Sequence, residues 1–132
     1  MPRNLIVLGT MNTADQSIAL IDMALRRRFH FHRLEPDTER LDRWLQREVP
    51  RMKVVASLLR ALNDKLRNHG VSRDRVVGHS HFMRPGLDED SLQLIWRGSI
   101  MPLVEELLHD QDQLVDTFDY ATFAEPLLAA KT

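Results

Sequence analysis

Polar side chains that could act on a phosphate group gather near the amino-terminal end of the sequence. Asn12 and Asp15 lie in a polar turn, and the triplet Arg26–Arg28 ends the segment that follows. An amide can bind a phosphate oxygen or orient an attacking water, and guanidinium groups neutralise charge that develops in phosphoryl transfer. Structural uses are equally open: an Asx turn for Asn12, a helix cap or an arginine partner for Asp15, and dipole compensation of roughly 0.3–1 kcal/mol for each arginine at a helix end.

Four histidines, arranged as two His-X-His pairs, offer a different chemistry. His30 and His32 fall on one face of an alternating segment, and His79 and His81 form the second pair. Imidazole nitrogens bind zinc and copper. No carboxylate or cysteine completes a known ligand spacing around these pairs, so we predict no metal site and keep a histidine-based metal-binding domain as an alternative.

Composition limits the class of protein. The chain has 132 residues, 43% of them hydrophobic, which suits about one domain with a modest core. Its net charge of -1 argues against a dedicated polyanion binder, although residues 1–66 carry twelve basic and eight acidic side chains and residues 67–132 carry six and eleven. Cysteine is absent, and no apolar run is long enough to cross a bilayer. We expect a soluble, cytoplasmic protein.

The amino-terminal residues would be positioned by three predicted elements, in the order strand, helix, strand. Leu5–Leu8 is apolar at consecutive positions, as in a strand buried on both faces. Apolar residues at helical spacing predict a helix from about Ile18 to Arg27, and alternation predicts a second strand from Phe29 to Leu34. Two such strands do not make a stable sheet alone, so the sequence looks like part of a larger module.

The remainder of the sequence is predicted to be helical. One amphipathic stripe, Leu41 to Leu45, ends before Pro50, and a longer stripe from Met52 to Leu66 has Gly70 as its carboxy-terminal cap. Further helices are predicted from Asp88, with a kink or restart at Pro102, and within Leu114–Leu128. Trp44, Trp96 and the leucine stripes are expected to form the core.

Two separated motifs identify a family. The segment GTMNTADQSIALIDMALRRRF, residues 9–29, together with VGHSHFM, residues 77–83, closely resembles the McrB branch of the AAA+ nucleoside triphosphatases. One departure is Gln16, which stands where the McrB-like turn has arginine. The sequence contains no G-x-x-x-x-G-K-[ST] phosphate loop, so the resemblance covers only the second half of the AAA+ module.

The resemblance implies an α/β fold that is predominantly helical overall. Residues 1–37 would be the carboxy-terminal part of the AAA+ core, with two sheet strands and a connecting helix, and residues 38–132 a mainly α-helical lid. It also implies roles for individual residues. Asn12 would be the sensor that contacts the terminal phosphate, Arg28, or failing it Arg27, would be an arginine finger reaching the neighbouring subunit's nucleotide, and Asp15, His79 and Ser80 would belong to the nucleotide pocket.

Cofactors and partners also follow from the resemblance. The full-length parent would use ATP or GTP with Mg²⁺, form a homo-oligomeric ring, a hexamer, and drive DNA translocation with a McrC-like nuclease subunit. The chain alone would neither hydrolyse nor tightly bind nucleotide, and its exposed strands would make it self-associate. The alternative from another class is an autonomous helical module that binds nucleic acid or another partner through Arg26–Arg28.

Overall fold

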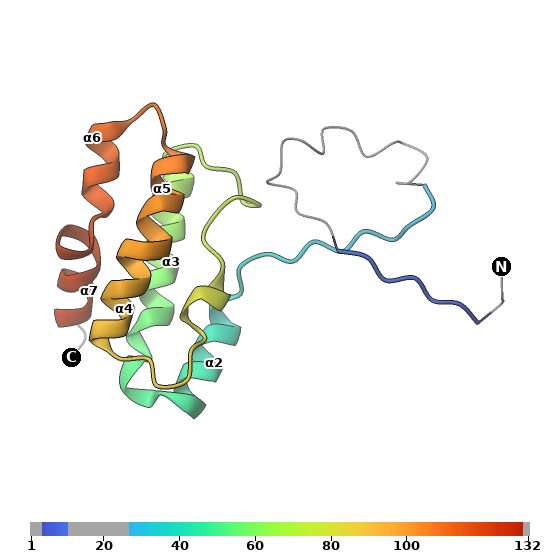
Figure 1. The fold of residues 1–132 in the computed structure, drawn as a ribbon, viewed down its shortest axis with the longest axis horizontal. Coiled ribbons are helices and arrows are strands. Elements are labelled where there is room, and N and C mark those ends of the chain that lie inside the picture. Colours follow the sequence, from blue (N-terminus) through green and yellow to red (C-terminus); the bar gives the residue numbers. More distant parts are fainter. Residues whose placement is uncertain (1–3, 11–26, 131–132) are drawn as a thin grey trace. The chain divides into compact units, whose positions relative to one another are not determined.

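The computed structural model of the chain describes residues 4–10 and 27–130. By its internal contacts the chain divides into two units, Met1–Leu34 and Glu35–Thr132. The second unit consists of helices and helical turns (Figure 1). None of the described helices is long and apolar enough to cross a membrane.

The described part of the first unit contains no β-strand, which corrects two predictions. Leu5–Leu8 runs without regular secondary structure, and Ile6 and Leu8 are 90% and 94% exposed. The segment from Phe29 to Leu34 is likewise not a strand. A buried strand needs neighbours for its backbone N–H and C=O groups, and two short segments do not supply them. The predicted helix lies outside the described residues, apart from Arg27, which lies in a turn.

The second unit begins with two helices joined by a tight turn. Helix α2 spans Thr38–Glu48, the 3₁₀ turn η2 spans Pro50–Met52 and α3 spans Val54–Asn68. Both helices were predicted, and the break between them falls at Pro50 because the residue before a proline is driven out of helical geometry. Accordingly Val49, with φ -145° and ψ 67°, lies outside the helical region.

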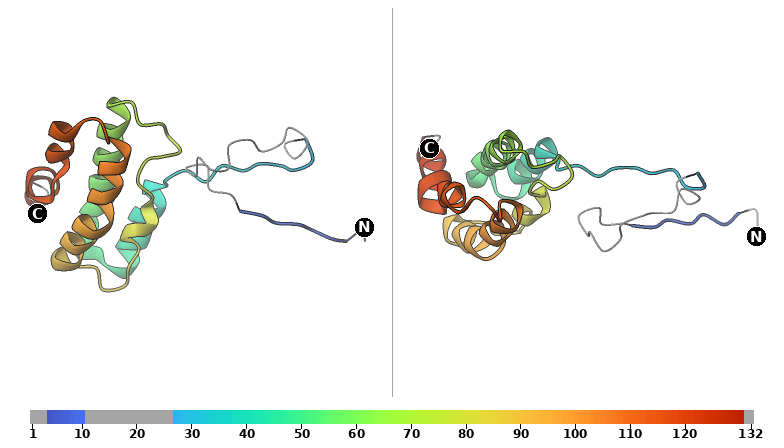
Figure 2. Two further views of the ribbon diagram at one scale, coloured as in Figure 1. Left: turned by 45° about the horizontal axis from the view of Figure 1, so that its top comes forward. Right: turned by 90° about the horizontal axis from the view of Figure 1, so that it is seen from above.

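Shorter elements complete the second unit. They are the 3₁₀ turn η3 (His79–Phe82), α4 (Glu89–Ile95), the π-helical turn η4 (Trp96–Ile100), α5 (Met101–Leu107), α6 (Asp112–Val115), the 3₁₀ turn η5 (Asp116–Phe118), the π-helical turn η6 (Tyr120–Ala124) and α7 (Glu125–Ala129). Helix α3 contacts both α2 and α7, and the views in Figure 2 place it between them.

Two prolines explain the π-helical turns. Pro102 lies two residues after η4, and Pro126 lies two residues after η6. A proline inside a helix has no N–H to donate and its ring collides with the carbonyl four residues earlier, so the preceding turn widens. The kink or restart predicted at Pro102 corresponds to the π-helical turn η4, after which α5 begins at Met101. The single helix predicted within Leu114–Leu128 is instead broken into short pieces, because Asp119 is extended (φ -56°, ψ 151°) and Pro126 follows.

Helix α3 carries much of the core. Its buried side chains include Leu59, Leu62 and Leu66, each 0% exposed. Trp96 is also fully buried, and its indole Nε1 donates to the carbonyl oxygen of Phe118 at 2.9 Å. The prediction of a core built on leucine stripes and Trp96 is confirmed, whereas Trp44 is half-buried and packs against the edge of the core.

Lys65 ties α3 to the carboxy-terminal elements. Its ammonium donates to the carbonyl oxygen and to the hydroxyl of Thr117, both at 2.7 Å, and lies 4.2 Å from the centre of the Phe118 ring. Burial lowers the pKa of Lys65, because the charged form loses water. The aliphatic stem packs while the charged end is satisfied by the backbone of η5.

Local sequence fixes the helix ends as predicted. Gly70 has a φ of +90°, its N–H donates to the carbonyl of Arg67 at 3.0 Å, and the N–H of Val71 donates to Leu66 at 3.1 Å, which is a Schellman motif. Asp88 caps α4 in a capping box with Ser91, whose N–H donates to the Asp88 carboxylate at 2.8 Å. Hydrogen bonds from the side chain and backbone of Ser91 hold the pKa of Asp88 below its ordinary value of 3.8.

The Asp88 cap predicts a specific loss of stability in acid. Because its pKa is lowered on folding, its contribution is complete above the unfolded pKa near 3.8 and is lost as pH falls through the folded pKa. Asp88→Asn keeps a good cap without a titrating group. We expect the variant to match the native chain at pH 7 and to lose less stability between pH 5 and pH 2, as urea titrations followed by circular dichroism at a series of pH values would measure. Glu106→Gln, on α5, controls for the loss of an exposed carboxylate, and parallel acid profiles for the native and Asp88→Asn chains contradict the assignment.

Candidate functional site

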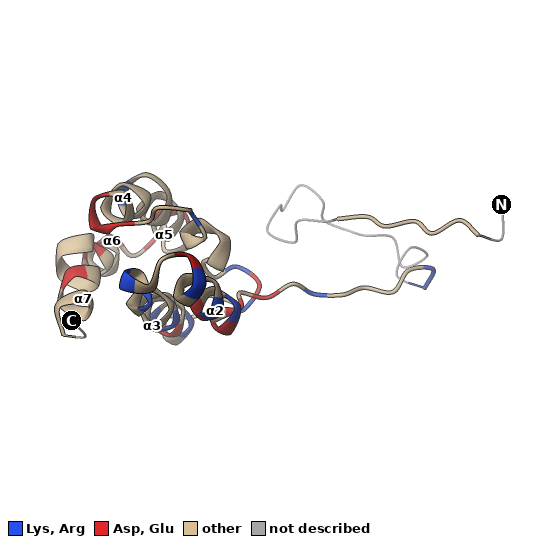
Figure 3. Ribbon diagram, turned by 90° about the horizontal axis from the view of Figure 1, so that it is seen from below, with Lys and Arg blue, Asp and Glu red and all other residues tan. Residues whose placement is uncertain are grey.

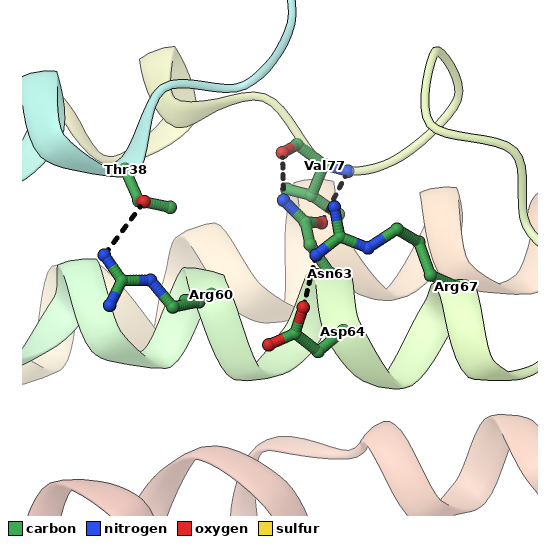
Figure 4. A network of polar contacts seen from close by, with 6 residues as sticks. All are labelled: Thr38, Arg60, Asn63, Asp64, Arg67 and Val77. Atoms are coloured by element: carbon green, nitrogen blue, oxygen red, sulfur yellow. Dashed lines mark hydrogen bonds and ion pairs between the residues drawn. The ribbon is translucent and has the colours of Figure 1, made fainter.

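A buried amide holds the segment that carries the second family motif. Asn63, on α3, is 4% exposed. Its Nδ2 donates to the carbonyl oxygen of Val77 at 2.9 Å, and its Oδ1 accepts from the N–H of Val77 at 2.9 Å (Figure 4). One side chain thus satisfies both backbone groups of a buried loop residue, which fixes the loop against α3. We call these two hydrogen bonds between Asn63 and Val77 the Asn63 clamp.

His79 connects the same segment to the start of α2. Its Nδ1 accepts from the backbone N–H of Asp37 at 3.1 Å, so that nitrogen carries no proton in this arrangement. Asp37 in turn caps α2, accepting from the N–H of Arg40 at 2.8 Å, and this hydrogen bond is the main cause that lowers the pKa of Asp37. Ser80, next along, is exposed. The predicted pocket residues His79 and Ser80 are therefore held near the point where α2 begins.

The second histidine of this pair has a different environment. His81 is half-buried, and its pKa is lowered first by burial and then by the positive charge of Arg84. Among residues 4–10 and 27–130, no group of three or more histidine, aspartate or glutamate side chains is placed to hold a metal ion. His30 and His32 are exposed and belong to the first unit.

An open pocket of about 220 Å³ lies beside the Asn63 clamp. It is lined by the segment before and at the start of α2, by one face of α3 and by the loop that follows α3, through Glu35, Pro36, Thr38, Arg60, Asn63, Asp64, Arg67, Arg73 and Val76. Arg60 donates to the hydroxyl of Thr38 at 3.3 Å, and Arg67 is paired with Asp64. The pocket was not predicted from the sequence, although the spacing of Arg60, Asp64 and Arg67 at four and three residues places them on one helix face.

The remaining predicted site residues lie in the first unit. Asn12 and Asp15 lie outside the described residues. Arg27 and Arg28 are exposed in a turn. His79 and Ser80 belong to the second unit and are neighbours in η3.

Comparisons with known proteins identify the helical part. Residues 54–116 match the family described as McrB, alpha-helical lid domain. Over 124 residues the chain is 35% identical to the Type IV methyl-directed restriction enzyme EcoKMcrB subunit of Escherichia coli strain K12, an alignment that covers 83% of the chain. The chain spans 27% of the length of that curated relative. No solved structure matches the chain. The family match runs from the start of α3 to the start of η5 and includes Asn63, Val77 and His79.

The clamp predicts a large cost for shortening Asn63. Asn63→Ala leaves the N–H and C=O of Val77 buried without partners, at about 1–3 kcal/mol for each group, so we expect a loss of about 2–5 kcal/mol in the free energy of unfolding measured in urea. Asn63→Asp keeps the acceptor but places a carboxylate oxygen against the Val77 carbonyl. The resulting loss in the free energy of unfolding should become smaller in acid, as the carboxyl is protonated.

Asn68, exposed at the end of α3, provides the matched control. Asn68→Ala should change the free energy of unfolding by no more than about 0.5 kcal/mol. Equal effects of alanine at positions 63 and 68 contradict the clamp.

Proposed function

This chain is a McrB-like protein with a McrB-type helical lid, and we propose that it serves as the nucleotide-facing lid and adjoining core segment of a nucleoside triphosphatase in a restriction system. The observation that carries the proposal is the coincidence of the family match, residues 54–116, with the helices that hold His79 and Ser80. The resemblance predicted from the two sequence motifs is thereby confirmed.

In this proposal the lid closes over the nucleotide through the segment that Asn63 fixes. His79 and Ser80 contact the nucleotide in this proposal. The hydrogen bonds of Asn63 with Val77 and of Asp37 with His79 limit the positions that this segment can take. A site that is positioned in advance loses less entropy when it binds, and this supports a binding role for the segment. We also propose that the nucleotide is ATP or GTP. We likewise propose that the whole protein acts on DNA.

The chemistry assigned to the first unit is the stabilisation of phosphoryl transfer. Asn12 contacts the terminal phosphate or the attacking water, Asp15 supports that turn, and Arg28, with Arg27 as the second candidate, reaches the nucleotide of the next subunit in a ring, which we propose to be a hexamer. Phosphoryl transfer gains most from positioned positive charge, because charge spreads over the oxygens of the transferred group. The exposure of Arg27 and Arg28 is compatible with a role outside their own subunit.

The strands missing from residues 4–10 and 27–34 have a place in the same proposal. These segments contain large apolar residues that are exposed, namely Leu5–Leu8, Phe29 and Phe31. We propose that these segments become strands when further strands of an AAA+ core pair with them, since pairing would bury the side chains and satisfy the backbone. A McrC-like nuclease and Mg²⁺ complete the proposed system.

The arginine finger is tested in rings of a subunit that carries this chain together with a phosphate loop. Arg28→Ala should leave nucleotide binding in its own subunit nearly intact and reduce hydrolysis by about 10³–10⁵, because the neighbour's transition state loses its charge partner. Lysine should rescue poorly, since it lacks the planar fork of arginine. Arg33→Ala, an exposed arginine of the same segment, is the matched control and should leave turnover near the native rate.

Mixing experiments then separate action on the neighbour from action within one subunit. Mixed rings combine Arg28→Ala subunits with subunits that are defective in their phosphate loop. Hydrolysis should recover at interfaces where a subunit with an intact phosphate loop adjoins a subunit with an intact Arg28. If the hydrolysis rate depends only on whether a subunit's own phosphate loop is intact, and not on residue 28 of the neighbouring subunit, the arginine-finger assignment is wrong.

A further inference from the structure

The pocket between α2, α3 and the loop after α3 has a charge pattern that suits an anion. Its lining includes three guanidinium groups, Arg60, Arg67 and Arg73, and two carboxylates, Glu35 and Asp64. None of the residues proposed above to touch nucleotide lines it. The pocket is therefore distinct from the residues that the proposed function assigns to the nucleotide.

Two of the arginines already have polar partners within the second unit. Arg60 donates to the Thr38 hydroxyl at 3.3 Å, and Arg67 is paired with Asp64, so both guanidinium groups lie on the side of α3 that faces the loop (Figure 4). The Asn63 clamp fixes the loop that forms the facing wall. A wall that is fixed in advance lowers the entropy cost of binding.

Hydrogen-bond donors exceed acceptors in this pocket. Each guanidinium has five N–H donors, and within the described residues Arg60 and Arg67 each make one side-chain hydrogen bond. The Thr38 hydroxyl accepts from Arg60 and keeps its own O–H to donate. Phosphate oxygens match this geometry, because the arginine fork binds two oxygens at once.

The surrounding charge favours an anion on this side of the second unit. Residues 35–84 carry eleven basic and seven acidic side chains, whereas residues 85–132 carry two basic and ten acidic. Figure 3 shows basic and acidic residues interspersed on α2 and α3, and acidic residues on α4 and α7. Such a separation produces a potential that attracts anions to the basic side.

The two carboxylates restrict which anion fits. A polymer of phosphodiesters would bring several negative charges past Glu35 and Asp64, whereas one compact group can lie among the arginines. The volume of about 220 Å³ is below the size of a typical drug-sized site, and it suits a single group. We propose that this pocket binds the phosphate group of a small molecule, held by Arg60, Arg67 and Arg73 with Thr38 as a neutral donor.

Titration of the ¹⁵N-labelled chain with inorganic phosphate tests the proposal. At constant ionic strength set with chloride, we expect saturable amide shifts confined to residues 35–38, 60–67 and 73–76. Arg60→Gln and Arg73→Gln should each weaken phosphate binding by about tenfold or more, as expected for a lost charged hydrogen bond. Arg97→Gln, exposed on η4 outside the pocket, is the control and should bind as the native chain does.

Asp64→Asn gives a result that misfolding cannot imitate. This variant removes the carboxylate that competes for Arg67, so phosphate affinity should rise. Absence of saturable shifts, shifts reproduced by chloride alone, or affinity unchanged in all pocket variants overturns the proposal. Tighter pocket binding by a single-stranded oligonucleotide than by phosphate also overturns it, since the ligand would then be a polymer. Nucleotide hydrolysis is not a readout here, so failure would leave the proposed function untouched.

Discussion

One buried amide determines how the second unit holds together. Asn63 is the one polar side chain found buried among the described residues, and both of its polar atoms are used by a single partner, Val77. Burial of an amide is tolerable only when all its groups are paired, and the backbone of Val77 is under the same constraint. The pairing therefore fixes the loop after α3 at one position, and the segment that continues into η3 starts from there.

Helix α3 distributes this constraint to the other elements. On one side Asn63 fixes the loop, and from there His79 accepts from Asp37 at the start of α2. On another side Lys65 bonds Thr117 and covers the Phe118 ring, which connects α3 to η5. The lid thus depends on long-range polar contacts from a single helix as well as on its leucine core. Such contacts can hold His79 and Ser80 in place beside a nucleotide, as the proposed function requires.

The sequence predicted the helices better than the contacts between them. Periodic leucines, Pro50, Gly70 and Asp88 signal helices and their ends through local physics, and these predictions were confirmed. The strand at Leu5–Leu8 was not, because a strand depends on partners that local pattern does not reveal. Asn63 gave no signal, since a lone asparagine in a helical stripe looks like any polar position. The pocket likewise depends on residues brought together from three segments, and only its α3 face has a recognisable spacing.

Hydrogen exchange at the amide of Val77 tests the central claim most directly. That amide lies in a loop outside regular secondary structure, and it is held there by its hydrogen bond to Asn63. We expect its exchange to be slowed to a degree comparable with the core amides of α3, such as that of Leu62, because release requires the clamp to open. Exchange at Val77 as rapid as at the exposed loop residues Ser72 and Arg73 would show that the clamp does not hold the loop and would contradict the account.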